Sequence, residues 1–390
     1  MRRCPLSYSM VENRYDLTAL HRLHPRLNDL CDLPYTSEKL RWESSQRADK
    51  LSIQGVQPKL SARLNVKNQI FELVDQQGFF ILKPQHIHFS SIPENEDLTM
   101  KLAKLTGLEV PDHGLIYGED EQLTYWIRRF DRMGRGQKIP IEDFAQLLEE
   151  SRDTKYRSSM EKVAGVLKTY CTFPQVEMAR LFKLVLFNFC CGNEDQHLKN
   201  FSLISESNVI RLSPAYDLLS STIVLKDPEE LALPLRGKKR KLKAEDLLEY
   251  YGQTVLALRP PAIENILREL AASLVQWPDW VRCSFLPEEL QEAYLGLVAE
   301  RTQRLGLASF EVDSSELELL QKASLKQGSG GHQSFFKQLE RYRAGPSFCL
   351  TPRQQETIQE RTTGSGGWQT AYRLLDDKVS SKRKRPRQSR

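Results

Sequence analysis

The sequence reads Gly192-Asn193-Glu194-Asp195-Gln196-His197-Leu198-Lys199-Asn200-Phe201 directly after a strongly apolar helical pattern, residues 174–191. Within this stretch the carboxylate of Asp195 is followed five positions later by the amide of Asn200. Transfer of a phosphoryl group requires a carboxylate that accepts the hydroxyl proton and oxygen ligands that hold Mg²⁺ against the phosphates. Loops that catalyse this transfer supply both with an Asp and an Asn at this spacing. The stretch therefore predicts Asp195 as a catalytic base and Asn200 as a ligand of Mg²⁺.

A further acidic residue lies where such a site needs its second metal ligand. Asp217 follows Asn200 by 17 positions, behind a short strand pattern at 209–212 and Pro214. Taken alone, Asp195 and Asn200 could equally be turn formers after a helix. Their joint placement with Asp217 favours phosphoryl transfer.

Lys83 ends the apolar strand pattern at 79–82. A lysine in this place is awkward for packing and could be a solvated strand end, but its ammonium group suits the α- and β-phosphates of ATP. We expect its carboxylate partner on the next helix to be Glu96. Glu94 is the competing candidate, although a carboxylate in the first turn is also favoured by the helix dipole.

The segment ahead of that strand reads Ser52-Ile53-Gln54-Gly55-Val56-Gln57-Pro58-Lys59. With one glycine it is not a G-x-G-x-x-G loop, and it is a weak nucleotide signal on its own. Its position before the lysine strand predicts that it covers the phosphates of ATP, with Gly55, Gln57 and Lys59 as contacts.

Three further features have weaker interpretations. The strand pattern 123–130 runs into charge and is a candidate for the hinge that meets adenine, at Arg128 and Phe130, or it is an ordinary strand end. His197 is interpreted as an orienting or structural histidine. The basic stretch 236–243 is either a solvated loop or a patch that contacts phosphate or RNA.

The order of the elements predicts the fold class. Short strand patterns dominate from about residue 51 to 130, and helical periodicity dominates beyond 140. Strands followed by helices, with one strand pair after the longest buried helix, predict an α/β (α+β) fold of two lobes with a cleft between them. We expect five parts: an N-terminal segment 1–50 that packs on the catalytic core, a strand-rich N-lobe 51–135, a helical C-lobe 136–307, a small all-α paired-helix module 308–379 and a basic disordered tail 380–390.

The C-terminal region has its own pattern. Residues 315–339 and 351–375 repeat at a spacing of 36 residues, each with a Gly-Ser-Gly-Gly helix break. The last nine residues hold six cations and no acid, so the net charge of +5 comes from this tail. We expect the tail to be attracted to RNA, DNA or an acidic protein, or to be a solubilising end without a partner.

Composition narrows the class of protein. Hydrophobic residues make up 40% of the 390 positions and charged residues 27%, which is ordinary for a soluble globular protein. No apolar segment follows the first four residues, and the best apolar stretch, 181–191, is too short to span a bilayer. The seven cysteines include no C-x-x-C spacing, which predicts reduced thiols without zinc or disulfides. We therefore expect a cytoplasmic protein with no membrane partner.

Together these segments resemble the HipA family of serine/threonine kinases. The resemblance covers about residues 40–305 and rests on the stretches 52–59, 80–84, 95–96, 129–132, 141–144, 192–202 and 213–220. It implies a two-lobed, protein-kinase-like fold that uses ATP with Mg²⁺ and phosphorylates a protein serine. By this similarity Asp195 is the catalytic base, Asn200 and Asp217 are the metal ligands, and Lys83 and Lys199 contact ATP.

The layout is similar to the HipT branch of that family, because only about 50 residues precede the Gly-containing loop, whereas HipA has a further N-terminal domain. The HipT loop carries two serines around one residue. Here Ser52-Ile53-Gln54 keeps only Ser52, so we expect one autophosphorylation site. The resemblance also implies an aminoacyl-tRNA synthetase as substrate, the tryptophanyl enzyme for HipT, and neutralisation by antitoxin proteins of the HipB or HipS type.

Two other functions remain as alternatives. Small-molecule phosphotransferases also use an Asp…Asn loop followed by an Asp, but the Ser52 loop argues against this class. A non-catalytic protein that binds nucleic acid or a partner would fit the basic stretches. The joint presence of Lys83, Asp195, Asn200 and Asp217 argues against that second class.

Overall fold

The structure is a computed structural model that describes residues 1–47, 57–134, 137–150, 155–225 and 229–307. The chain divides into two units, residues 1–310 and 311–390, and the described residues belong to the first. The predicted module 308–379, the predicted tail 380–390 and the loop residues Ser52 and Gly55 lie outside the described residues.

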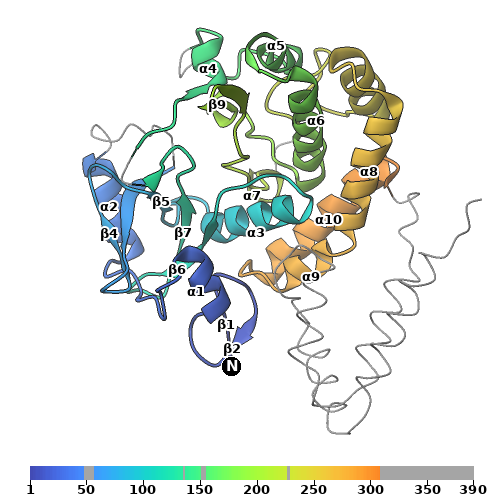
Figure 1. The fold of residues 1–390 in the computed structure, drawn as a ribbon. Helices are drawn as coiled ribbons and strands as arrows, with labels where there is room; N and C mark the ends of the chain where they lie inside the picture. Colours follow the sequence, from blue (N-terminus) through green and yellow to red (C-terminus); the bar gives the residue numbers. More distant parts are fainter. Residues whose placement is uncertain (48–56, 135–136, 151–154, 226–228, 308–390) are drawn as a thin grey trace, which may run out of the picture. The chain divides into compact units, whose positions relative to one another are not determined.

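A five-stranded antiparallel sheet forms one half of this unit (Figure 1). Its spatial order is β4-β3-β5-β7-β6, built from β3 (Leu60–Asn65), β4 (Ile70–Leu73), β5 (Phe80–Lys83), β6 (His113–Tyr117) and β7 (Leu123–Arg128). In the central strand, Leu82 lies opposite Leu60 on one side and Trp126 on the other. A Cβ atom on Gly78, just before β5, would lie 2.0 Å from Ser61 Oγ and 3.0 Å from the backbone oxygen of Ala62, so a larger residue would force these neighbours to move. The last residue of β5, Lys83, is thereby held in the middle of the sheet.

Helix α3 (Ile92–Leu105) is buried over almost its whole circumference. It contacts β6 and β7 of the sheet and α9 of the helical half (Figure 1). Very little of its surface is therefore exposed to solvent. Pro93 lies in its first turn, where a missing backbone N–H costs nothing, and the helix ends before Gly107, whose φ is 79°. Its charged residues are therefore buried, and buried charges require partners.

The N-terminal segment packs against the other face of the sheet region. It contains β1 (Arg2–Arg3), β2 (Met10–Val11), α1 (Leu17–Leu23) and α2 (Ser37–Arg47). Asp16 caps α1 by accepting hydrogen bonds from the backbone of Thr18 and Ala19. One hydrophobic cluster joins this segment to the strands, and its buried members are Cys4, Leu6, Tyr15, Ala19, Leu20, Leu23, Leu27, Leu30, Leu33, Leu40, Leu60, Ala62, Phe71, Phe80, Leu82, Ile116 and Trp126.

Helices form the other half, around the buried helix α6 (Pro174–Cys191), which contacts α5 (Met160–Tyr170), α8 (Pro260–Leu274) and α10 (Glu288–Arg304) (Figure 1). A three-stranded sheet of order β10-β9-β8 lies beside it, from β8 (Ile141–Asp143), β9 (Ser202–Glu206) and β10 (Val209–Leu212). The remaining helices are α4 (Phe144–Leu147), η2 (Leu198–Asn200), α7 (Thr222–Leu225), the π-helix η3 (Asp246–Val255) and α9 (Trp277–Arg282). Among the described helices, none combines the length and apolar character needed to cross a bilayer.

The mixed α/β fold class is the predicted one, and the differences from prediction are local. Helical periodicity is expected from just beyond residue 140, but residues 141–143 form a strand, β8, and α4 follows it. Asp143 caps α4 in a capping box with Gln146, so helical structure cannot begin before this residue. Helix α9 was not predicted, because its six residues are too few to show a helical period.

Candidate active site

Lys83 lies between two carboxylates, one from each half of the unit. Its Nζ atom is 2.5 Å from Glu96 Oε1 on α3 and forms a second short ion pair with Asp217 Oδ1. The side chains of Lys83 and Glu96 are 4% and 0% exposed, so the pair is out of contact with bulk water. Glu94, the competing candidate, instead accepts both hydrogen bonds from Gln85, at 2.7 and 3.0 Å. Strand β5, helix α3 and the segment after β10 therefore meet at the ammonium group of Lys83.

The electrostatics of this cluster follow from burial and charge. Burial alone would lower the pKa of Lys83, but Asp217 and Glu96 outweigh it and raise that pKa above its ordinary value. Burial would raise the pKa of Asp217, but Lys59 and Lys83 hold it well below its ordinary value. Burial raises the pKa of Glu96 to about 7, because Lys83 offsets only part of the desolvation. Lys83 and Asp217 thus remain charged at neutral pH.

The Asp217 segment is held in place by α3. The backbone of Asp217 has a φ of 59°, in the left-handed region that a residue other than glycine rarely adopts. Three residues later, Ser220 is bound by the side chain of Asn95, which donates to the Ser220 carbonyl and accepts from its N–H, both at 2.9 Å. Lys59 adds a longer ion pair, 3.7 Å from Asp217 Oδ2. Two neighbouring residues of α3 therefore position the lysine and the aspartate.

The loop that carries Asp195 begins at Gly192, where α6 ends in the left-handed conformation, φ 69°. A Cβ atom there would lie 2.4 Å from Leu297 Cδ2 and 2.5 Å from Thr222 Oγ1, so the turn requires glycine. The loop is then closed on itself by Asn200, whose Nδ2 donates to the Asp195 carbonyl at 2.9 Å. Gln196 donates in turn to the Asn200 carbonyl at 2.7 Å.

The donor set fits a magnesium ion. Asn200 uses its amide nitrogen within the loop, which leaves its side-chain oxygen as the atom available to a cation. Asp217 supplies a carboxylate that stays ionised. Mg²⁺ is usually bound by one or two protein oxygens together with substrate phosphates. Within the described residues, no three or more His, Cys, Asp or Glu side chains form a cluster that could hold a metal by itself.

The carboxylate of Asp195 has a partner that the sequence did not indicate. The hydroxyl of Tyr156 donates a short hydrogen bond to Asp195 Oδ1, from a position 39 residues upstream. The Tyr156 ring meets the His197 ring edge to face, with centroids 5.1 Å apart. Burial lowers the pKa of His197, and Asp195 offsets only part of this effect. His197 is thus disfavoured as a cation, and its Nε2 atom lies 2.7 Å from Lys155 Nζ.

The predicted adenine-side residues fall in two different places. The rings of Phe130 and Tyr216 are in contact at a tilt, with centroids 5.5 Å apart, and the Tyr216 hydroxyl donates to the carbonyl of Lys199 at 2.9 Å. Phe130 and Lys199 therefore join the Asp217 segment. Arg128 instead donates to the carbonyl of Leu23 at 2.7 Å, and this holds its guanidinium on the N-terminal segment. Gln57, the first described residue of the predicted phosphate loop, is half-buried.

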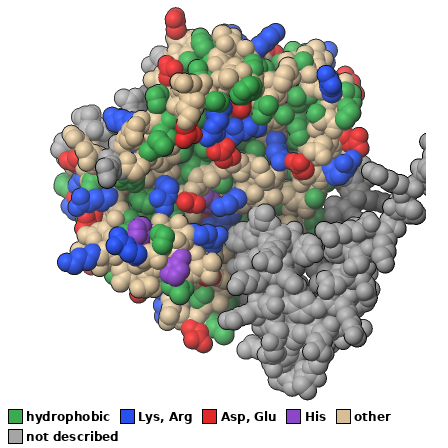
Figure 2. Space-filling view, viewed as in Figure 1, with side chains coloured by type: hydrophobic (Ala, Val, Ile, Leu, Met, Phe, Trp, Pro, Cys, Tyr) green, Lys and Arg blue, Asp and Glu red, His purple; other side chains and the backbone are tan. Residues whose placement is uncertain are grey.

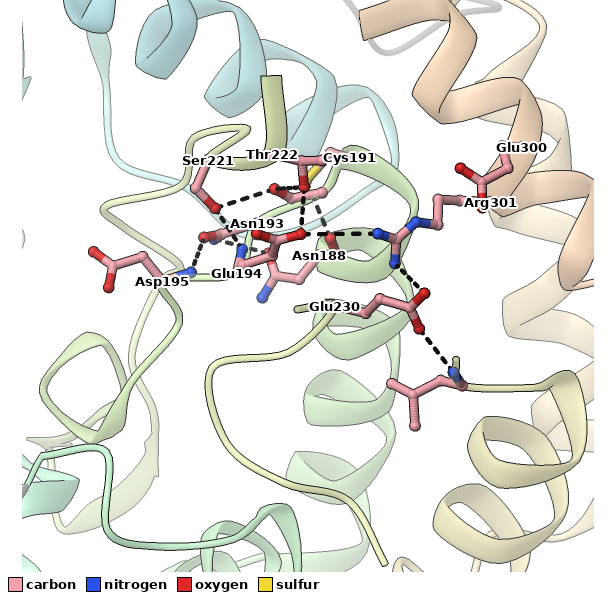
Figure 3. A network of polar contacts seen from close by, with 12 residues as sticks. Asn188, Cys191, Asn193, Glu194, Asp195, Ser221, Thr222, Glu230, Glu300 and Arg301 are labelled. Atoms are coloured by element: carbon pink, nitrogen blue, oxygen red, sulfur yellow. Dashed lines mark hydrogen bonds and ion pairs between the residues drawn. The ribbon is translucent and has the colours of Figure 1, made fainter. Parts of the chain in front are cut away.

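A buried ion network ties the loop that carries Asp195 to α10 (Figure 3). Arg301 lies 3.8 Å from Glu194 and 3.7 Å from Glu230, and all three side chains are no more than 8% exposed. Glu230 also pairs with Arg304 at 2.5 Å and accepts a hydrogen bond from the backbone of Leu242 at 2.7 Å. In Figure 3 the Asp195 carboxylate points away from this network.

The charged groups of the site lie between the two halves. On the face in Figure 2, basic and acidic side chains gather along the middle of the molecule, where the strand-rich half meets the helical half. Lys83 and Lys59 come from the strand-rich half, and Asp195, Asn200 and Asp217 come from the helical half. Such an arrangement can bind a polyanion between the halves and present a carboxylate beside it.

Comparisons with known proteins show which family the chain resembles. Residues 51–277 match the family described as HipA-like C-terminal domain. A Haemophilus influenzae protein that is named as a kinase is 30% identical over 334 residues, which cover 78% of this chain and 96% of that protein. The serine/threonine-protein kinase toxin HipA of Shewanella oneidensis is 29% identical over 214 residues, which cover 50% of this chain and 48% of the toxin.

A solved structure shares the fold. It is the HipA chain in a complex of the Shewanella oneidensis toxin–antitoxin system with HipB and operator DNA, and it superposes with a TM-score of 0.56. The two chains are 22% identical in sequence, and the match covers 73% of this chain and 74% of that one.

Proposed function

This chain belongs to the family of the HipA-like C-terminal domain, and on that premise we propose that it is a serine/threonine protein kinase that uses ATP with Mg²⁺. Asp195 accepts the proton of the acceptor hydroxyl, and Lys83, held by Glu96, binds the phosphates. Asn200 and Asp217 hold Mg²⁺, which neutralises phosphate charge when bound. Lys59 and Gln57, with Gly55 outside the described residues, cover the phosphates, and Phe130 and Lys199 contact the nucleotide.

The observation that carries this proposal is the burial of Lys83 between Glu96 and Asp217. Burying three charges has a desolvation cost that ion pairing in the interior often fails to recover, so such a cluster is weak evidence for stability. The position of this cluster at the junction of the two halves is explained if substrate binding replaces part of the Lys83–Asp217 ion pair. Lys83 would then bind a phosphate of ATP, and Asp217 would bind the metal ion. A non-catalytic binding protein has no use for this arrangement.

The test is transfer of label from γ-labelled ATP to protein, with and without Mg²⁺. We expect incorporation in the wild type and its loss in Asp195→Asn, with Asp279→Asn on α9 as the control of equal chemistry outside the site. Equal incorporation in wild type and Asp195→Asn would reject the assignment of the base. Transfer to small molecules but not to any protein would favour the alternative phosphotransferase class.

The resemblance to HipT supports a narrower proposal about substrate and regulation. We propose that the chain autophosphorylates on Ser52 and phosphorylates an aminoacyl-tRNA synthetase, of which the tryptophanyl enzyme is the first candidate. Phosphoproteomics after brief induction of wild type and of Asp195→Asn tests both parts. A synthetase serine phosphorylated only with the wild type would support the proposal, and its absence among the modified proteins would contradict the substrate.

The proposed partner follows from the same family. The structurally similar HipA was solved with HipB and operator DNA, and we propose that this chain is likewise neutralised by antitoxin proteins of the HipB or HipS type. Growth arrest on induction that is relieved by co-expression of an antitoxin of the HipB or HipS type would support this. Arrest that persists in their presence would contradict it.

A further inference from the structure

Tyr156 places a hydroxyl group on the predicted catalytic base. This residue lies between α4 and α5, and its Oη atom donates to Asp195 Oδ1. A hydroxyl bonded to a catalytic carboxylate is the arrangement that an acceptor needs immediately before phosphoryl transfer. Within the described residues, the hydrogen bonds to this carboxylate come from Tyr156 and from no other side chain.

The surroundings hold the tyrosine ring in that position. His197 meets the ring edge to face at 5.1 Å, and the carbonyl of Lys155 accepts a hydrogen bond from the backbone of Leu198 at 3.3 Å. The segment before α5 is thus attached to the loop at His197 and Leu198, just after Asp195. Tyr156 nevertheless keeps 40% of its surface exposed, so it is not a core residue whose hydroxyl merely needed a buried partner.

We propose that Tyr156 is a phosphoacceptor of the chain's own active site. This inference rests on the proposed kinase function, which supplies ATP as the co-substrate. The phenolic oxygen of Tyr156 forms a bond to the γ-phosphorus of ATP. The bond from that phosphorus to the bridging oxygen breaks, and its electron pair leaves on ADP. The phenolic proton passes to Asp195.

The charges around the ring give the modification a consequence. A phosphate on Tyr156 carries roughly −1.5 to −2 charges at neutral pH and is repelled by the carboxylate of Asp195. The Nζ atoms of Lys155 and Lys239 lie over the Tyr156 ring, 4.9 and 6.0 Å from its centroid. Both ammonium groups can attract the phosphate. The modified side chain therefore leaves Asp195 for the lysines, which frees the base for another acceptor.

The experiment is mass spectrometry of phosphatase-treated, full-length protein after incubation with ATP and Mg²⁺. We expect phosphate on Tyr156 in the wild type and a decrease of about 10²- to 10⁴-fold in its rate of formation in Asp195→Asn. Because Tyr156 contacts the base of its own chain, the rate constant should not depend on protein concentration. Asp195→Asn protein mixed with wild type should also stay unmodified at Tyr156.

Tyr170 provides the matched control, since it is 44% exposed at the end of α5 and does not contact Asp195. We expect no phosphate there. Phosphate on other residues with Tyr156 unmodified would overturn this inference alone. No incorporation anywhere would overturn the proposed function and this inference with it. Equal phosphorylation of Tyr156 and Tyr170 would overturn the inference about Tyr156. Equal phosphorylation of Tyr156 in wild type and in Asp195→Asn would overturn it as well.

Discussion

Arg301 on α10 lies 3.8 Å from the carboxylate of Glu194, the residue directly before Asp195 (Figure 3). The same guanidinium lies 3.7 Å from Glu230, so one cation joins the loop that carries Asp195 to the segment that leads into the basic stretch 236–243. The side chains of Arg301 and Glu194 are both buried. Removal of either one leaves an uncompensated charge in the interior.

Arg301→Met is therefore expected to destabilise the protein by about 3–5 kcal/mol, the usual effect of breaking a buried ion pair. Urea unfolding followed by fluorescence measures this change. Arg268→Met is the control, because Arg268 and its partner Glu264 are 64% and 61% exposed and such pairs contribute little. A similar loss of stability in both variants would show that the Arg301 network has no special role.

Asp195→Asn is expected to lower the rate of phosphoryl transfer by about 10²- to 10⁴-fold, because it keeps the side chain's size but removes the proton acceptor. The melting temperature should stay close to that of the wild type, since Asp195 is partly exposed and the Asn200 bond to its carbonyl does not involve the side chain. Single-turnover kinetics and calorimetry on the same preparations separate these effects. A large drop in melting temperature would mean that lost activity reports lost folding.

Glu94 is expected to make stability depend on pH. Burial raises its pKa from 4.5 to about 7, although two hydrogen bonds from Gln85 lower it in part. A carboxyl group whose pKa is higher in the folded state stabilises the fold below the unfolded value, and this contribution is lost as the pH rises through about 7. Glu94→Gln should thus be more stable than the wild type at pH 8, by on the order of 2–3 kcal/mol.

The advantage of Glu94→Gln should disappear when the pH falls below about 4.5, where the wild-type carboxyl is protonated in both states. Unfolding free energies measured across this range for both proteins decide the question. The same substitution at exposed Glu264 on α8 controls for a general change in net charge. An advantage of equal size at pH 4 and pH 8 would contradict the shifted pKa.

Gly192→Ala is expected to destabilise the protein for two reasons that a second glycine can separate. Its φ of 69° is strained for alanine, and the added Cβ would meet Leu297 and Thr222 at 2.4 and 2.5 Å. Gly237 has a similar φ of 74° but no neighbour within 4 Å, so Gly237→Ala measures the backbone strain alone. We expect the crowding at Gly192 to add about 1–3 kcal/mol, measured as the difference between the two unfolding free energies.

The sequence was enough to predict those pairs of site residues that lie close together along the chain. Asp195 and Asn200 lie in one loop, and Lys83 and Glu96 are separated by a single turn region, so residue type and spacing were enough to pair them. Tyr156 and Arg301 lie 39 and 106 positions from Asp195, and no local pattern reports a contact across such a distance. Their positions depend on the packing of α5 and α10 against α6, which is a tertiary property.

The same reasoning explains the local errors in the fold. The segment 141–143 has two exposed residues and one half-buried residue, so it carries no apolar alternation by which a strand could be recognised. It becomes a strand because β9 offers backbone hydrogen-bond partners to it. Arg128 ends its strand as predicted, but its guanidinium donates a hydrogen bond to the carbonyl of Leu23. Spacing along the sequence gives no indication that these two groups are close together.

The contacts of α3 have a consequence for how substitutions in this region combine. Glu96 binds the lysine, and its neighbour Asn95 binds the backbone beyond Asp217. Because both side chains are attached to one short length of helix, a displacement that disturbs either contact changes the other as well. Free-energy changes at Asn95 and Glu96 are therefore expected to be non-additive. In a double-mutant cycle, the second substitution should cost much less than it does alone, since the first already releases both halves of the site.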